Sequence, residues 1–166
     1  MKSWIWAAIL AIGIIIGVIG YQLLIPIILP SIQQTFEYID KTAATENAFG
    51  KPFSLMIIIF LKNLSVALIC FITAKWSKGF IPGFIMLMNG MVIGMLGVLV
   101  TNSGMPVMSF IMGVLPHGIV ELPALFLATA IGMFGISQES WRTASIPFLM
   151  LLVAAGIESY ITPLLM

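Results

Sequence analysis

Charged side chains are scarce in this chain. Of its 166 residues only 8% are Asp, Glu, Lys or Arg, whereas 61% are hydrophobic. Soluble domains average about 25% charged residues. The scarcity excludes an ordinary soluble domain, and the lack of a basic stripe argues against nucleic-acid binding through the phosphate backbone. The sequence therefore predicts an integral membrane protein that is surrounded by lipid.

Several signatures of catalysis are also missing. The single cysteine, Cys70, cannot form an internal disulfide, and its apolar surroundings predict a small packing residue. The single histidine excludes a His-Glu-x-x-His zinc motif. No phosphate-binding P-loop motif is present, so the chain is not expected to be an ATPase itself.

Long apolar segments make up most of the sequence. A membrane span needs about 20 such residues. We therefore expect an all-α, polytopic membrane bundle of about five transmembrane helices, forming a single domain over 1–166. The fourth helix is expected to be broken near Pro116. The first is read as an uncleaved anchor that Pro26 and Pro30 end or kink. The expected spans are about 4–29, 53–74, 83–100, 108–135 and 145–165.

The polar connections indicate an orientation. The longest, 31–51, is expected to form a short amphipathic helix at the membrane interface. Basic residues favour the cytoplasmic side of a membrane protein. We therefore expect a protein of the cell (plasma) membrane with a cytoplasmic N-terminus and an outer C-terminus. This places on the inside Lys2, Lys75, Lys78 and Arg142.

Ionisable side chains interrupt three of the predicted spans. Lys62 lies in the second span, His117 and Glu121 in the fourth, and Glu158 in the fifth. A charged group near the bilayer centre costs at least ~2.5–3.5 kcal/mol, so such residues are candidates for a functional site. His117 and Glu121 are four residues apart and would share one face of a helix.

These ionisable residues are expected to lie at similar depths. From a rise of ~1.5 Å per residue, Lys62, Glu121 and Glu158 lie about 10–14 Å below the outer ends of their helices. Two asparagines fall at comparable depth. We therefore expect one buried polar cluster of Lys62, Asn63, Asn89, His117, Glu121 and Glu158.

The chemistry of this cluster has two catalytic interpretations. Glu121 or Glu158 could act as a general base on water or a peptide amine, with Asn63 or Asn89 donating to an oxyanion. His117, Glu121 and Glu158 are thus the candidate catalytic residues. The same three side chains also match the ligand types of a zinc site with one open position.

A structural interpretation stands beside the catalytic ones. Lys62 could pair with Glu121 or Glu158 and hold the bundle in one arrangement. Asn63 and Asn89 could hydrogen-bond across helices, at about 0.6 kcal/mol each. The residue types alone leave these alternatives open.

Four stretches resemble the stage II sporulation protein M family, in the family's order over about 50–163. The most specific are Pro-His-Gly-x-x-Glu-Leu and the ending Ala-Ala-x-x-Glu-x-x-x-Thr-Pro. The matching stretches are Phe60-Leu61-Lys62-Asn63-Leu64, Asn89-Gly90 with Gly94, Leu115-Pro116-His117-Gly118-Ile119-Val120-Glu121-Leu122, and Ala154-Ala155-Gly156-Ile157-Glu158-Ser159-Tyr160-Ile161-Thr162-Pro163.

The resemblance implies a polytopic membrane protein. The sporulation member of the family works with cell-wall hydrolases during engulfment of the forespore. Relatives occur beside transporter ATPase subunits and in gene clusters for head-to-tail cyclised bacteriocins. This chain is shorter than the sporulation member, and it has Lys62 where an Asn-Asn pair is common. Its compact length is more similar to the bacteriocin-associated relatives.

From this resemblance we expect a membrane subunit of a complex that matures or exports a hydrophobic, bacteriocin-like peptide. The expected partners are other membrane subunits and a transporter ATPase, in an oligomer or hetero-complex. One alternative is an intramembrane peptidase or cyclase that uses His117, Glu121 and Glu158. Another is a noncatalytic scaffold that recruits cell-wall hydrolases in sporulation.

Overall fold

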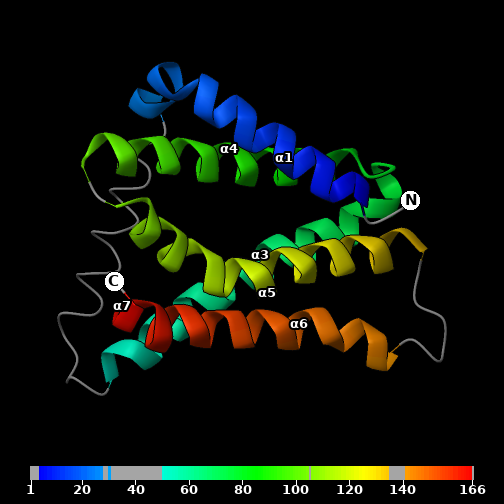
Figure 1. The fold of residues 1–166 in the computed structure, drawn as a ribbon. Helices are drawn as coiled ribbons and strands as arrows, with labels where there is room; N and C mark the ends of the chain where they lie inside the picture. Colours follow the sequence, from blue (N-terminus) through cyan, green and yellow to red (C-terminus); the bar gives the residue numbers. More distant parts are fainter. Residues whose placement is uncertain (1–3, 28–29, 31–49, 105, 135–140, 166) are drawn as a thin grey trace.

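The protein is a bundle of helices. The computed structural model describes residues 4–27, 30, 50–104, 106–134 and 141–165, and every regular element in this part of the chain is helical. The predicted all-α class is confirmed. Figure 1 shows the arrangement of the elements α1 (Trp4–Ile19), α3 (Gly50–Trp76), α4 (Phe80–Asn102), α5 (Val107–Phe134), α6 (Trp141–Gly156), η2 (Ile157–Ile161) and α7 (Thr162–Leu165).

Three of the described helical stretches are long and apolar enough to cross a membrane: Pro52–Trp76, Phe80–Asn102 and Ala144–Ile161. A fourth span results if α1 and the bent segment after it count as one. The apolar stretch Gly118–Phe134 of α5 is shorter, although α5 as a whole has 28 residues. The expected number of about five spans is therefore approximate.

The first apolar segment bends earlier than its prolines predict. Trp4–Ile19 and the helical segment Tyr21–Ile27 meet at 91°. The sequence prediction named Pro26 and Pro30 as the residues that end or kink this segment and did not include the bend, which falls at Gly20. The carbonyl of Gly20 accepts the N–H groups of Leu23 and Leu24, both at 3.0 Å, and so starts the second segment. An interfacial helix is expected in 31–51, and residues 31–49 of that segment lie outside the described residues.

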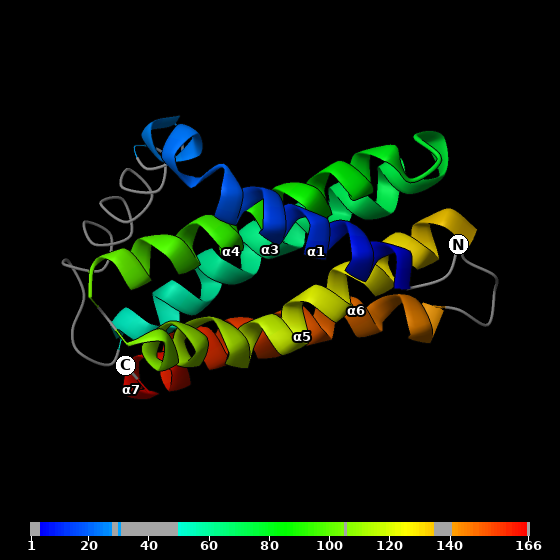
Figure 2. The same cartoon turned by 45° about the horizontal axis from the view of Figure 1, so that its top comes forward.

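Helix α1 packs in parallel against α4, and the two lie side by side in both views (Figures 1 and 2). Glycines allow this contact. A Cβ atom added at Gly13 or Gly17 would collide with the backbone of Leu87 or Met91. From the other side, Gly90 and Gly94 meet the α1 backbone in the same way, at the carbonyls of Leu10 and Ile14. The interface is a small-x-x-x-small pattern on both helices.

Helices α3, α5 and α6 pack against one another and form the second part of the bundle. Their contact surfaces also consist of small residues. A Cβ atom at Gly132 of α5 would collide with the backbone of Phe71 in α3. The free cysteine Cys70 is buried in this core, as predicted. Fully buried small side chains of the two helices are Ala67, Cys70, Ala74, Ala124 and Ala128.

The turn between α3 and α4 and the course of α5 are the remaining features of the fold. A tight turn with positive φ at Lys78 and Gly79 joins α3 to α4, and Ser77 Oγ accepts the N–H of Ile81 at 3.2 Å. The expected break near Pro116 is absent, because α5 is one continuous helix from Val107 to Phe134. Its ribbon instead bends partway along (Figure 1). Proline removes one backbone hydrogen bond and kinks a helix, and packing against neighbouring helices maintains its continuity.

Candidate functional site

The polar site is centred on Glu121, which lies in α5 and is half-buried. The side chain of Asn63, from the facing helix α3, hydrogen-bonds with the Glu121 carboxyl group. Asn63 is only 8% exposed, so its amide is directed into the bundle rather than toward lipid. A buried amide and a carboxyl group in apolar surroundings each need such a partner. This hydrogen bond therefore ties α3 to α5 at the level of the site.

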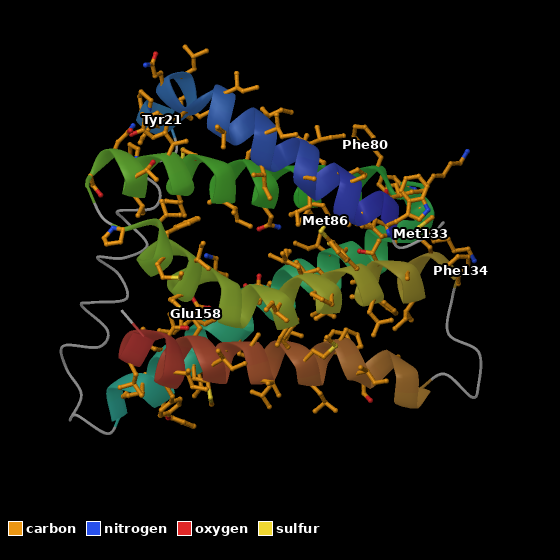
Figure 3. The ribbon with its side chains drawn as sticks, in the orientation of Figure 1. Tyr21, Phe80, Met86, Met133, Phe134 and Glu158 are labelled. Carbon is orange, nitrogen blue, oxygen red and sulfur yellow. The ribbon has the colours of Figure 1, made fainter. Side chains whose placement is uncertain are left out.

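Two further charges act on Glu121. Lys62 attracts its carboxylate and Glu158 repels it. Glu158 lies in η2, on the side of the C-terminal helices that faces α5 (Figure 3). The structure thus brings together four of the six predicted residues, from α3, α5 and η2. This group holds two carboxyl groups, those of Glu121 and Glu158, and one amine, that of Lys62.

Lys62 differs from the other three residues in its exposure. Its side chain is exposed on the surface of the chain, near the middle of the 27-residue helix α3. At ~1.5 Å per residue this position is about 20 Å from either end of the helix. An ammonium group at that depth needs oppositely charged or polar neighbours. Glu121 supplies one such neighbour.

Glu158 occupies an unusual piece of backbone. Residues Ile157–Ile161 form one π-helical turn, in which the Thr162 N–H donates to the carbonyl of Ile157. Such single π-turns inside α-helices are frequent at functional sites. Sequence reasoning missed both this turn and the hydroxyl of Thr162, which is buried and has no hydrogen-bond partner. The available signal was the Thr162-Pro163 pair that begins four residues after Glu158, since a proline removes a donor from a helix.

Asn89 does not belong to this group. Its amide nitrogen donates to the carbonyl of Ile85 in its own helix, at 3.0 Å. It lies instead in an open apolar groove between α3 and α4. The groove is lined by Val66, Ile69, Phe84, Ile85, Met88, Asn89 and Val92. The sequence predicts that Asn89 joins the polar cluster because it lies at a similar depth. In the structure Asn89 lies instead on the face of α4 that lines the groove.

His117 lies in the continuous part of α5, but its side chain is outside the described residues. Among the side chains that are described, no three His, Cys, Asp or Glu residues come together as metal ligands. A zinc site of His117, Glu121 and Glu158 stays a prediction.

The described geometry supports two kinds of chemistry. A carboxylate beside a second carboxylate and an amide has the groups for proton transfer and for hydrogen-bonding a polarised carbonyl. The same groups, with Lys62, also form a charge network that fixes three helices relative to one another. Both uses require the site to remain largely free of bulk water, which its position within apolar helices provides.

The four stretches that resemble the family now have a structural meaning. Asn63, Glu121 and Glu158 meet at one site, whereas Gly90 and Gly94 form the contact with α1. No curated protein and no solved structure matches the chain. The family model of stage II sporulation protein M matches residues 6–163, nearly the whole chain. This protein is therefore a membrane protein that belongs to the stage II sporulation protein M family.

Proposed function

We propose that this protein is the membrane subunit of a complex that matures or exports a hydrophobic, bacteriocin-like peptide. A transporter ATPase would supply the energy, because the chain has no nucleotide-binding motif of its own. The observation that supports the proposal is an apolar groove on α3 and α4, whose lining residue Val66 lies one helical turn from Lys62.

The groove suits an extended or helical apolar peptide. Its volume is about 290 Å³, and it is lined by aliphatic, aromatic and methionine side chains with one amide. Lys62 lies four residues before Val66 and so shares its helix face. A peptide inside a membrane must satisfy its backbone polar groups. Asn89 within the groove and Lys62 at its end are placed to do so.

Site-specific crosslinking tests this proposal. A photoreactive residue replaces Val92 in the groove, and the protein is coexpressed with an epitope-tagged bacteriocin-type precursor. The matched position is Ile72, which is 69% exposed on α3 and does not line the groove. We expect a crosslink to the precursor from position 92 and none from position 72.

A second measurement links the groove to activity. Val92→Trp fills the groove, and we expect it to lower secretion of mature peptide at least tenfold. Ile72→Trp adds the same bulk toward lipid and should leave secretion unchanged. Equal crosslinking from both positions, together with normal secretion by Val92→Trp, would refute the proposal.

A second candidate function is that of an intramembrane peptidase or cyclase. The observation that favours it is the pairing of Glu121 with Glu158 beside the Asn63 amide. One carboxylate would take a proton from water or a peptide amine, and Asn63 would donate to the carbonyl oxygen under attack. This function needs an ionisable group at position 121, whereas the subunit function does not.

A further inference from the structure

Thr162 departs from a pattern that seven other helical polar side chains follow. Ser, Thr and Asn side chains in membrane helices usually return a hydrogen bond to a carbonyl three or four residues earlier. The side chains that do so here are Ser65, Thr73, Asn89, Thr101, Ser103, Thr129 and Ser159. Thr162 is 6% exposed, yet among the described residues its Oγ1 is the buried side-chain oxygen without a partner.

The π-turn leaves a second free group beside this hydroxyl. In an α-helix the carbonyl of Glu158 would accept the N–H of Thr162, but that N–H donates to Ile157. In a π-helix the carbonyl would accept from residue 163, which is a proline and has no N–H. The carbonyl of Glu158 is therefore left without a donor from its own helix.

These free oxygens lie at the polar site. Thr162 follows Glu158 by four residues, and α7, which it begins, packs against α5, the helix that carries Glu121. The turn η2 packs against both α3 and α5. The Glu158 carboxylate, its carbonyl and the Thr162 hydroxyl therefore belong to the end of the C-terminal helices that packs against α5. We refer to this end, Glu158–Thr162, as one wall of the site. The Glu121 carboxylate of α5 interacts electrostatically with Glu158.

We propose that this wall binds a small, dehydrated monovalent cation of the size and hardness of sodium. All the free groups are oxygens, which hard cations prefer to nitrogen or sulfur ligands. Irregular helical turns that free backbone carbonyls are a general means of holding such ions within membranes. The group has one more carboxyl group than it has amines, and one added positive charge matches this excess, whereas a divalent ion would exceed it.

Ion-dependent stability of the full-length protein in detergent tests this inference. Thermal unfolding is followed at pH 8 in sodium chloride and in choline chloride of equal ionic strength. Binding to the folded state raises the midpoint in a saturable way. We expect a rise of roughly 5–10 °C when sodium is about 100 times its dissociation constant.

Two valine variants separate the ion site from general packing. Thr162→Val keeps the shape of the side chain and removes the hydroxyl, and we expect it to weaken the sodium response at least tenfold in concentration. Thr129→Val is the matched control, because Thr129 is also buried and its hydroxyl is bonded to the Leu125 carbonyl at 2.8 Å. It should keep the response of the parent protein.

The outcomes decide the inference independently of any peptide. A midpoint that is the same in sodium and choline, or an equal response of both valine variants, would overturn it. A larger response to calcium than to sodium would overturn the assignment to a monovalent ion. Failure of peptide crosslinking to the α3–α4 groove would leave the ion site unaffected, because none of its groups lines that groove.

Discussion

Replacing Gly90 by alanine is predicted to separate α1 from α4. The added Cβ atom would collide with the carbonyl of Leu10 and lie 2.9 Å from the nitrogen of Ile14 and 3.0 Å from Cα of Gly13. All three are backbone atoms, so no side-chain movement can relieve the overlap. The two helices must therefore move apart along their contact.

The magnitude follows from a comparison with Gly118. A Cβ atom at Gly118 meets nothing within 4 Å, so Gly118→Ala experiences no overlap. Both variants share the intrinsic gain of about 1 kcal/mol for alanine in a helix. Their difference therefore isolates the overlap, and we expect Gly90→Ala to be about 1–3 kcal/mol less stable than Gly118→Ala.

The measurement is the loss of helicity during titration with a denaturing detergent, which gives the free energy of unfolding of each variant. Gly83 supplies a second control in the same helix as Gly90, because its added Cβ would lie 3.6 Å from Ile9 and 3.7 Å from Trp6 side-chain atoms, an ordinary contact. Gly118→Ala and Gly83→Ala should both be more stable than Gly90→Ala. If Gly90→Ala were as stable as Gly118→Ala, the parallel glycine contact would be wrong.

Three further predictions concern the charges and the orientation. Lys62→Met should lower the free energy of unfolding of the bundle, and adding Glu121→Gln or Glu158→Gln should restore part of that loss; additive effects in both double mutants would reject the pairing. Glu121→Gln alone should fold and retain peptide maturation if the site is structural or binds cargo, but lose it if Glu121 is a general base. A membrane-impermeant thiol reagent added outside cells should label a cysteine at Ser103 and spare one at Trp76; the opposite pattern would invert the topology.

The sequence predicts the long helices well because their signal is additive. The spans expected at 53–74, 83–100 and 108–135 correspond to α3, α4 and α5 within a few residues. Each of these helices contains many apolar residues, and all of them indicate the same span. Single breaks are different, since the bend at Gly20 depends on one residue without a Cβ atom, while Pro26 is accommodated inside a helical segment.

The polar site was predictable in part. Depth along a helix can be counted from sequence, and it grouped Glu121 with Lys62, Asn63 and Glu158, all three of which interact with Glu121 in the structure. The direction in which each residue faces depends on tertiary packing, and this separates Asn89 from the others. The π-turn at Glu158 inserts a local change of register, so Thr162 lies outside what helical periodicity can predict.

The contact between α1 and α4 imposes a delay on the assembly of this protein in its membrane. Gly13 packs against Leu87, which the ribosome adds about 70 residues later. At ordinary rates of synthesis this interval lasts roughly 4–15 s. During that interval α1 exposes its glycine face with no partner from its own chain, next to any other newly inserted helix. The α3 helix emerges first and must leave that face free. Correct pairing of the first helix therefore depends on the arrival of the third long helix.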